Sequence, residues 1–454
     1  MKMSTTAVQP KENKMGTMPI NKLLLNMSLP MMIAMLIQAL YNIIDSMFVA
    51  QISENALSAV SLAFPMQNFM IAVGTGTGVG VNALLSKSLG AKRIKIANKT
   101  ANVSMFLVFM NWILFILIGL FIAKPFLMGQ TKVAEIVDYG NTYLRICCVA
   151  SLGIYAEIAL ERLLQATGRT FYTMITQATG AVVNIILDPI LIFGMFGMPK
   201  MGVAGAALAT VIGQFIAAGL ALFFNLRVNH DIKFDWKNML PTKFVLFHIY
   251  KVAVPSILMV SIGSVMMFCM NRILEVFTTT AIAVFGVYFK LQSFIFMPIF
   301  GMNNGMVPII AYNYGARHRD RIIGTIKLAV MYAVAMMLIG FAVFQIIPDK
   351  LLLMFNASEN MLAIGVPALR LISISFLLAG FNIICSSVFQ AMGNGVFSLI
   401  VSVVRQLVVL VPVAFLISKM GVLDRIWWSF PIAEVVAAAI CIFFLRKILK
   451  MLDF

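Results

Sequence analysis

One carboxylate, Asp188, lies inside an apolar run long enough to cross a lipid bilayer. A carboxylate at bilayer depth is costly, so such a residue usually faces the protein interior and has a function. Asn184, Gln177 and Thr173 precede Asp188 at helical intervals, which places these polar groups on one stripe of a helix. Pro189 frees the carbonyl four residues before it, which predicts a bend or a cation-binding carbonyl beside the acid. The stripe predicts a coupling-ion site of a secondary transporter.

A second carboxylate, Asp45, has the same setting in the first apolar run. Gln38 and Asn42 extend it into a polar stripe at i, i+4 and i+7. Asp45 and Asp188 each lie roughly 18 residues into their spans, about 27 Å along a helix, so they should share one depth. Two carboxylates in an apolar pocket should share an exchangeable proton or hold a cation such as sodium. The alternative is that each acid only anchors a loop end at the outer surface.

Other charged residues also fall within apolar spans. Glu161 follows Glu157 by one helical turn and adjoins an arginine, which indicates a salt bridge or a solvated helix end, whereas Glu157 is deeper and could extend a proton path. Lys290, Arg405 and Glu434 each lie about nine residues into a span, at roughly 14 Å depth. They predict a buried ion-pair network between three helices, and the alternative places Lys290 on a cavity wall.

The composition excludes a soluble globular protein. Of 454 residues, 61% are hydrophobic and 11% are charged. Twelve apolar spans can be marked, at about 24–50, 57–81, 99–123, 141–162, 170–196, 202–226, 249–271, 281–307, 322–347, 364–387, 396–418 and 425–448. The predicted fold class is therefore an all-α polytopic membrane protein with twelve transmembrane helices.

The distribution of basic residues predicts the orientation in the membrane. If the N-terminus is inside, the inner loops and tails hold 23 of the 34 Lys and Arg residues and the outer loops hold 7. This bias predicts that both termini are in the cytoplasm. The net charge of +17 then follows from topology and from attraction to anionic membrane lipids, so no nucleic-acid partner is expected.

We find no set of residues in the sequence that is typical of an enzyme active site or of a metal site. All five cysteines fall in spans, and the three histidines form no metal-ligand spacing. No nucleophile with a matching base lies within the spans. We therefore expect neither an enzyme nor a cofactor, and no metal site except for sodium at the two aspartates. The glycine-rich 74–80 segment lies inside a span and indicates close helix packing.

The second half of the sequence repeats the first in one constant register. The register joins Pro30 to Pro255, Gln67 to Gln292, Gly76 to Gly301, Gly90-Ala91 to Gly315-Ala316, and Gln165-Ala166 to Gln390-Ala391. The predicted organisation is an N-terminal tail at 1–23, a six-helix bundle at 24–226, a cytoplasmic linker at 227–250 and a second bundle at 251–454. An even number of spans relates the bundles by a pseudo-twofold axis along the membrane normal, which suits alternating access.

The repeat also shows which features are not shared. Asp45 corresponds to Met270 and Asp188 to Val413, so the acids are a specialisation of the first half. Pro30 and Pro255 correspond and, with Pro189, are candidates for helix bends. The chain has 36 Phe and 34 Met, mostly lipid-facing or core residues, which could also form an adaptable substrate lining.

These motifs together resemble the multidrug and toxic compound extrusion (MATE) family. The resemblance rests on the two six-span repeats and on four segments: Ser28-Leu29-Pro30, 184–194, Pro308-Ile-Ile-Ala-Tyr-Asn-Tyr-Gly315 and Gln165-Ala-Thr-Gly168. It is strongest to the DinF- and MepA-like bacterial branch, which implies coupling residues at Asp45 and Asp188, with Asn184 one turn earlier, and an acid at Glu161. The NorM-like branch has acids in helices 7 and 10. Span 7 here has only Glu275, near its outer end, and span 10 has none.

The resemblance implies a monomeric antiporter that exports cationic or amphipathic drug-like compounds, driven by inward flow of protons or sodium. The nearest alternative is a flippase or exporter of lipid-linked or polysaccharide precursors. A flippase of that kind should have a strongly cationic cavity, whereas the two aspartates predict an acidic one. A channel or a membrane-embedded enzyme is the alternative from another class.

Overall fold

The computed structural model describes residues 13–235, 237 and 239–452, so most of the predicted tail lies outside the described residues. The first half forms α1 (Lys14–Thr17), α2 (Ile20–Ala50), α3 (Glu54–Gly90), α4 (Ile94–Leu117), the π-helix η1 (Ile118–Ile122), α5 (Ala123–Met128), α6 (Ala134–Val149), α7 (Leu152–Ala166), α8 (Thr170–Phe193), the 3₁₀ turn η2 (Met195–Gly197) and α9 (Val203–Arg227). The second half forms α10 (Lys243–Glu275), α11 (Thr279–Gly315), α12 (Arg319–Ile346), α13 (Pro348–Leu353), α14 (Glu359–Ser373), α15 (Phe376–Ala391), α16 (Gly395–Val403), the π-helix η4 (Val404–Leu410), α17 (Val411–Ser418), α18 (Leu423–Ile426) and α19 (Ser429–Lys450).

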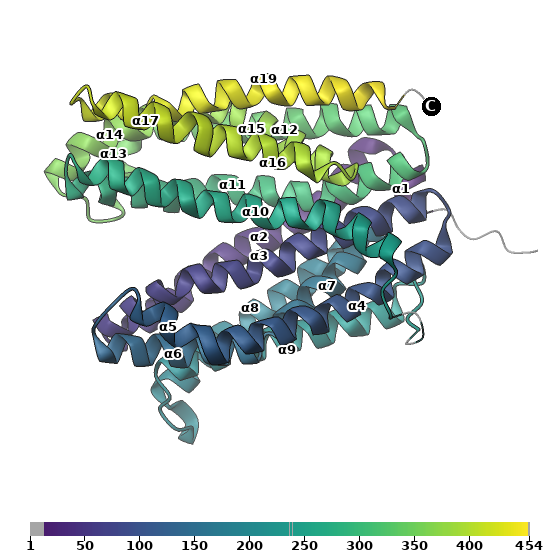
Figure 1. The fold of residues 1–454 in the computed structure, drawn as a ribbon, viewed down its shortest axis with the longest axis horizontal. Helices are drawn as coiled ribbons and strands as arrows, with labels where there is room; N and C mark the ends of the chain where they lie inside the picture. The colour runs from purple at the N-terminus through teal and green to yellow at the C-terminus, as the bar shows by residue number, and fades with distance from the viewer. Residues whose placement is uncertain (1–12, 236, 238, 453–454) are drawn as a thin grey trace, which may run out of the picture.

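These helices form two bundles that diverge toward one end of the molecule, as Figure 1 shows. The first bundle contains α2 to α9 and the second contains α10 to α19. We call the end where the bundles separate the open end; it carries the connections at 51–53, 129–133, 276–278 and 354–358. The closed end, where they meet, carries α1 and the connections at 91–93, 167–169, 228–242 and 316–318.

The predicted membrane fold is confirmed. Within the described residues, nine helices are long and apolar enough to cross a bilayer, and counting each of two bent helix pairs as one span gives eleven. The remaining predicted span corresponds to α19, which packs against α15 in the second bundle. The bent pairs are α6 with α7, at 47°, and α14 with α15, at 51°. Neither break contains a proline, whereas Pro30, Pro189 and Pro255 lie inside helices that continue through them.

The largest difference from the predicted boundaries is at the end of α3. This helix continues to Gly90, whereas the apolar span ends at residue 81. The added turns contain buried polar residues, and Ser86 Oγ donates hydrogen bonds to Asn82 Oδ1 and to Ala166 O, both at 3.1 Å. Hydropathy does not predict these turns as part of the span, because they are buried in protein, where their polar groups form hydrogen bonds.

Glycines at matching positions of the repeat allow the bundles to touch. On α3, a Cβ on Gly80 would overlap Ile249 O of α10. On α11, a Cβ on Gly305, the counterpart of Gly80 in the repeat, would lie 2.7 Å from the carbonyl carbon of Met27 on α2. The contact of α3 with α10 is thus repeated as the contact of α11 with α2, as a pseudo-twofold axis requires.

The same symmetry brings α3 and α11 together at the closed end. A Cβ on Gly90 would overlap Tyr312 O, and a Cβ on Gly315 would overlap Lys87 O. Each residue of the first contact has its counterpart in the second, because the repeat joins Gly90 to Gly315 and Lys87 to Tyr312. These contacts need glycine because only a residue without a side chain lets two helix backbones approach so closely.

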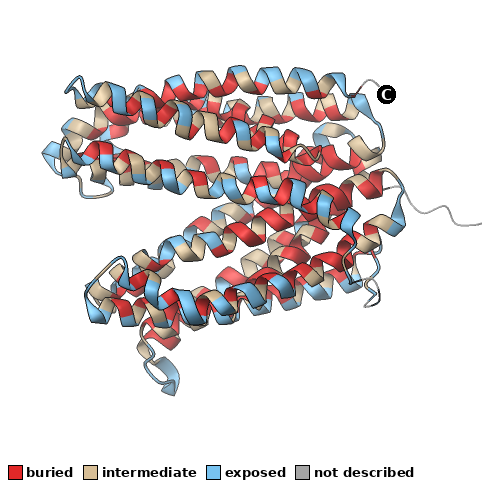
Figure 2. Cartoon of the chain, viewed as in Figure 1, coloured by how far each residue is buried: buried red, intermediate tan, exposed pale blue. Residues whose placement is uncertain are grey.

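Burial follows the two-bundle arrangement. Figure 2 shows buried residues concentrated inside the bundles and toward the closed end, with exposed residues along the outer faces. Those outer faces are apolar: Phe121 is 70% exposed, Ile339 67% and Phe443 66%. Large apolar side chains on the outside are expected where a helix faces lipid.

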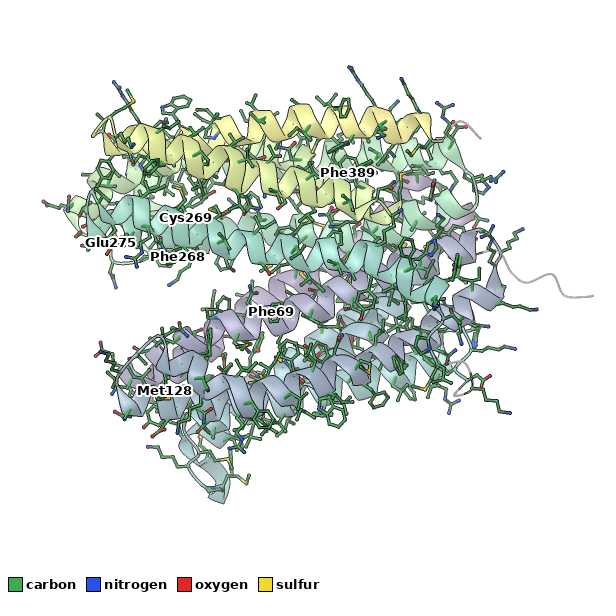
Figure 3. All side chains as sticks on the ribbon, viewed as in Figure 1. Phe69, Met128, Phe268, Cys269, Glu275 and Phe389 are labelled. Atoms are coloured by element: carbon green, nitrogen blue, oxygen red, sulfur yellow. The ribbon has the colours of Figure 1, made fainter. Side chains whose placement is uncertain are left out.

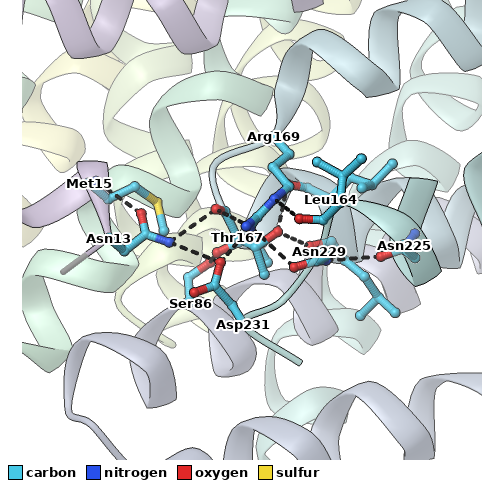
Figure 4. Close-up of polar contacts among 12 residues, drawn as sticks. Asn13, Met15, Ser86, Leu164, Thr167, Arg169, Asn225, Asn229 and Asp231 are labelled. Carbon is cyan, nitrogen blue, oxygen red and sulfur yellow. Dashed lines mark hydrogen bonds and ion pairs between the residues drawn. The ribbon is translucent and has the colours of Figure 1, made fainter. Parts of the chain in front are cut away.

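A polar cluster holds the closed end of the first bundle together (Figure 4). Arg169, at the start of α8, forms an ion pair with Asp231 of the 228–242 connection and donates from Nε to Val228 O at 3.0 Å. Asn13, before α1, donates to Thr167 O at 3.1 Å. These contacts attach both the segment before α2 and the connection between the bundles to the turn between α7 and α8.

Candidate functional site

The two aspartates predicted to pair lie against each other in the first bundle. The carboxyls of Asp45 on α2 and Asp188 on α8 are within hydrogen-bond distance, because α2 packs along α8. Asp188 is fully buried. Two ionised carboxylates in contact would repel strongly, so this geometry requires a proton or a cation between them.

Part of the carboxyl pair has no protein partner. Asp45 Oδ1 and Asp188 Oδ1 are both buried, and within the described residues neither has a hydrogen-bond partner. An unsatisfied buried oxygen is costly in a low-dielectric interior. A proton, a water molecule or a sodium ion would therefore be stabilised most by binding at these two oxygen atoms.

Asn184, Thr210 and Tyr41 complete the site. With its amide nitrogen toward the pair, Asn184 donates to Asp188 Oδ2 at 3.0 Å, and its oxygen accepts from Thr210 N at 2.9 Å and from Thr210 Oγ1 at 3.1 Å. The hydroxyls of Thr210, on α9, and Tyr41, on α2, lie near each other. Three helices thus fix the pair.

Three residues of the predicted stripes lie elsewhere. Asn42 is exposed, and Gln38 is half-buried and lies two turns before Asp45 on the same face of α2, about 10 Å along the helix. Gln177 is three turns from Asp188, and its Nε2 donates to Glu161 Oε2 at 2.7 Å. It belongs to a second polar cluster in the same bundle.

That second cluster surrounds Glu161. This residue is only 3% exposed and accepts hydrogen bonds from Thr176 Oγ1 at 2.6 Å and Gln177 Nε2 at 2.7 Å. The expected solvated helix end is therefore not observed, and Arg162 donates instead to Gln165 Oε1 at 2.8 Å and to Asn304 Oδ1 at 2.9 Å. Glu157 lies one turn away on α7, close enough to interact with the Glu161 charge.

The predicted ion network of the second bundle is present in part. Arg405 Nη1 lies 3.0 Å from Glu434 Oε1, and Asn382 donates to the other carboxylate oxygen, Glu434 Oε2. This joins η4, α15 and α19. Arg405 lies on the π-helix η4. Widening of a helix turn of this kind changes where side chains point and is frequent at functional sites.

Lys290 is not a member of this network, which corrects the prediction. It is exposed, and its Nζ lies 5.9 Å from the ring centroid of Phe355. Tyr288 and Gln292 of α11 line the central cavity, and each is two residues, or about 200° of helix rotation, from Lys290. Lys290 therefore points away from both the cavity and Glu434.

A cavity of about 650 Å³ lies between the bundles and is lined mainly by the second one. Its wall combines aromatic and methionine side chains with amides and hydroxyls; examples are Phe289, Phe296, Met259, Met266, Gln292, Gln390 and Ser387. Its charged residues are Arg162, Arg405 and Glu434. The aspartate pair is not part of this wall, so the cavity and the buried carboxyls are separate sites. A mostly apolar cavity of this size with a few polar groups suits a drug-sized amphipathic molecule.

No larger cluster of metal-ligating residues occurs in the described parts of the chain: no three His, Cys, Asp or Glu side chains come together there. The five cysteines are free thiols. Two pseudosymmetric helical bundles with a cavity between them are the architecture of a membrane transporter.

The sequence comparison then gives the family. The MatE family model matches residues 30–190 and 255–416, so the chain belongs to the MatE family and the resemblance to MATE transporters is confirmed. The two matched segments begin at Pro30 and Pro255, which are counterparts in the register of the sequence repeat.

Relatives of the chain include bacterial exporters. The chain is 30% identical over 429 residues to the multidrug export protein MepA of Staphylococcus haemolyticus, covering 93% of each chain. It is 29% identical over 439 residues to MepA of Staphylococcus aureus strain MRSA252, covering 94% of each.

Solved structures of MATE proteins share the fold. The crystal structure of MATE in complex with MaL6 has a TM-score of 0.91 at 24% identity, covering 98% of this chain and all of that one. The outward-facing conformation of a multidrug resistance MATE family transporter has a TM-score of 0.90 at 24% identity, covering 98% and 99%.

Proposed function

We propose that the protein is a multidrug efflux antiporter that couples inward movement of protons or sodium to export of cationic or amphipathic compounds. The observation that carries this proposal is the contact between Asp45 and Asp188. A buried carboxyl pair that must hold one proton or cation is a site that an ion gradient can fill and empty. The names of the staphylococcal relatives support drugs as the exported molecules.

The orientation of Asn184 favours the proton as the coupling ion. When its amide nitrogen donates to Asp188 Oδ2, it presents a donor, and a donor cannot bind sodium. The reversed amide would present an oxygen and suit sodium, which takes oxygen ligands. With the amide nitrogen toward Asp188 Oδ2 and the amide oxygen toward Thr210, both ends of the amide are satisfied, which supports the proton as the coupling ion.

The cavity supports amphipathic substrates. Its apolar wall of Phe and Met can adapt to different shapes, and amide groups provide neutral hydrogen-bond partners. The aspartate pair lies outside the cavity wall, so the acidic cavity predicted from the sequence is not observed. The charged lining is Arg162 with the Arg405–Glu434 ion pair, which falls short of the strongly cationic cavity expected of a flippase for lipid-linked precursors. This observation favours drug efflux over the flippase alternative.

The geometry also suggests how transport proceeds. The bundles touch at the closed end through glycine contacts and separate at the open end, so exchange of these two arrangements would expose the cavity to either side in turn. We place the closed end in the cytoplasm of a bacterial cell, because it carries most of the basic loops, and we expect a monomer.

The experiment that tests the coupling uses purified protein in liposomes. Wild-type protein should move a fluorescent amphipathic drug against its gradient when a pH gradient is imposed, and a sodium gradient alone should have no effect. Asp188→Asn keeps the shape of the side chain but cannot exchange a proton, so it should lose gradient-driven transport while remaining folded. Transport by this variant at the wild-type rate would refute the coupling site, and sodium-driven transport would refute the choice of ion.

A further inference from the structure

A second, smaller pocket lies at the closed end, where both bundles contribute to it. It has a volume of about 300 Å³ and is lined from the first bundle by Lys87 and Arg93, and from the second by His248 and Arg317. We call this pocket the basic notch. No Asp or Glu occurs among the described residues that line it. Lys251 also lies close enough to Lys87 to repel its charge.

Apolar side chains border the charged part of the notch. Leu84 and Ile96 come from the first bundle and Phe244 from the second. Phe244 is 49% exposed and Ile96 is half-buried. The notch therefore offers cationic groups next to an apolar surface at one end of the membrane-spanning helices.

The internal repeat supplies the key comparison. In its register, Lys87 corresponds to Tyr312, Ser88 to Asn313, Arg93 to His318 and Ile96 to Arg321, which defines a counterpart of the notch on the other side of the pseudo-twofold axis. In that counterpart the chain itself fills the space, through α1.

The contacts of α1 show what the counterpart accepts. Asn313 Nδ2 donates to Met15 O at 3.0 Å, and Arg321 Nη2 donates to Met15 O at 2.9 Å and to Met18 O at 2.8 Å. The Met15 side chain is fully buried, and Gly16 packs against the Tyr312 ring. The counterpart thus takes oxygen acceptors together with an apolar group.

Among the residues that the structure describes, none fills the basic notch as α1 fills the counterpart. The residue that corresponds to Met15 is Leu240, which is 70% exposed. One of two related positions is therefore occupied by the protein's own oxygen atoms, whereas the other is a pocket lined by cations.

We infer that the basic notch binds a phosphate-bearing anion, and that its occupant is the headgroup of an anionic phospholipid. Lys87 and Arg93 from the first bundle and His248 from the second would contact the phosphate, as the Arg and Asn side chains of the counterpart contact backbone carbonyls. Leu84, Ile96 and Phe244 would contact the start of an acyl chain. Free phosphate could make the contacts with the basic side chains, but it has no acyl chain to contact the apolar ones.

A ligand at this position would act on the conformation of the protein. Lys87 and Arg93 belong to one bundle and His248 to the other, so the complete site exists only while the closed end is closed. A ligand that binds one of two conformations more tightly shifts the population toward it. The lipid should therefore favour the state that is open at the other end.

Native mass spectrometry of the full chain in detergent tests the site, with phosphatidylglycerol, phosphatidylcholine or inorganic phosphate added. Wild-type protein should retain phosphatidylglycerol in preference to phosphatidylcholine. Arg93→Gln should weaken the retained binding about fivefold, and the double variant Lys87→Gln, Arg93→Gln about 25-fold. Lys95→Gln removes an exposed lysine of α4 that does not line the notch and should bind as wild type does.

Each contrary result has a definite meaning. Equal binding by the double variant and wild type would overturn the site. If Lys95→Gln weakens phosphatidylglycerol binding as much as Arg93→Gln does, the binding comes from general surface charge and the site is also overturned. Displacement of the lipid by inorganic phosphate at similar concentration would overturn the lipid assignment. If the double variant has a lowered melting temperature, Arg93→Gln alone decides, because Arg93 is exposed and its replacement leaves the helix contacts in place.

Discussion

Replacing Gly305 by alanine should open the closed end of the molecule. In the structure, a Cβ at this position would lie 2.6 Å from Ser28 Oγ and 2.7 Å from two backbone carbons of α2, Met27 C and Ser28 Cα. Optimal carbon–carbon contacts are about 3.5–4.0 Å, so α2 and α11 would have to separate by roughly 1 Å. The hydroxyl can rotate away, but the backbone atoms cannot.

The size of the effect follows from this overlap. Overpacking a close contact typically costs about 1–3 kcal/mol. Since about 1.4 kcal/mol changes an equilibrium constant tenfold, the closed-end contact should be disfavoured by roughly 5- to 150-fold. The substitution Gly286→Ala is the matched control: it lies on the same helix, gains the same helix propensity of about 1 kcal/mol, and its Cβ would have open space.

Spin labels on cysteines at positions 128 and 275 report the opening directly. Met128 and Glu275 lie at the open end, one in each bundle (Figure 3). A Cys269→Ser background removes the one native thiol that is not buried. Gly305→Ala should add a population with a shorter label-to-label distance, and Gly286→Ala should match the wild type. Identical distance distributions in the two variants would refute the view that the glycine contact holds the closed end.

Four further predictions concern the ion site, the second bundle and the topology. Asp45→Asn should abolish gradient-driven efflux as Asp188→Asn does, because one proton serves both carboxyls; a liposome assay in which only one variant is inactive would contradict this. Pro189→Ala should slow transport and leave its pH dependence unchanged in the same assay. Glu434→Gln should lower stability by about 2 kcal/mol in a detergent melt, since it leaves a guanidinium unpaired, and an unchanged melting temperature would refute this role. Tags at both termini should be protected from protease in intact cells, while the 348–363 segment is accessible; an accessible C-terminal tag would reverse the assignment of the closed end to the cytoplasm.

The fold could be predicted because the features that determine it, the length of the apolar runs and the internal repeat, can be recognised in the sequence. Apolar length determines the spans, and the repeat determines how the bundles correspond, down to the glycine contacts at Gly90 and Gly315. The bends within the two broken spans could not be predicted, since neither contains a proline at its break. The polar end of α3 was missed because hydropathy measures compatibility with lipid, and these turns are buried in protein.

The candidate site was predictable only where one helix carried the pattern. Asp45 and Asp188 stand out as acids in apolar runs, and Asn184 lies one turn from Asp188. Thr210 gave no signal, because a threonine in an alanine-rich helix is ordinary. Tyr41 could have been found, since it lies one turn before Asp45 on the same face.

The remaining errors came from the direction of a side chain around its helix and from its distance along the helix. Lys290 shares its apparent depth with Arg405 and Glu434, but depth along a span does not determine which way a residue points. Gln177 lies on the same stripe as Asp188 but too far along the helix to reach it, and its partner is Glu161.

The separation of the aspartate pair from the main cavity has a consequence for how this protein can evolve. The carboxyls are held by α2, α8 and α9, whereas most of the cavity wall belongs to the second bundle. A substitution at Met259 or Gln390 can change which molecules fit without altering the carboxyl contact that we propose as the ion site. Selection by a new toxic compound can therefore act on one half of a duplicated chain while the proposed coupling pair in the other half stays unchanged. Variants with altered drug resistance should accordingly accumulate in the second bundle.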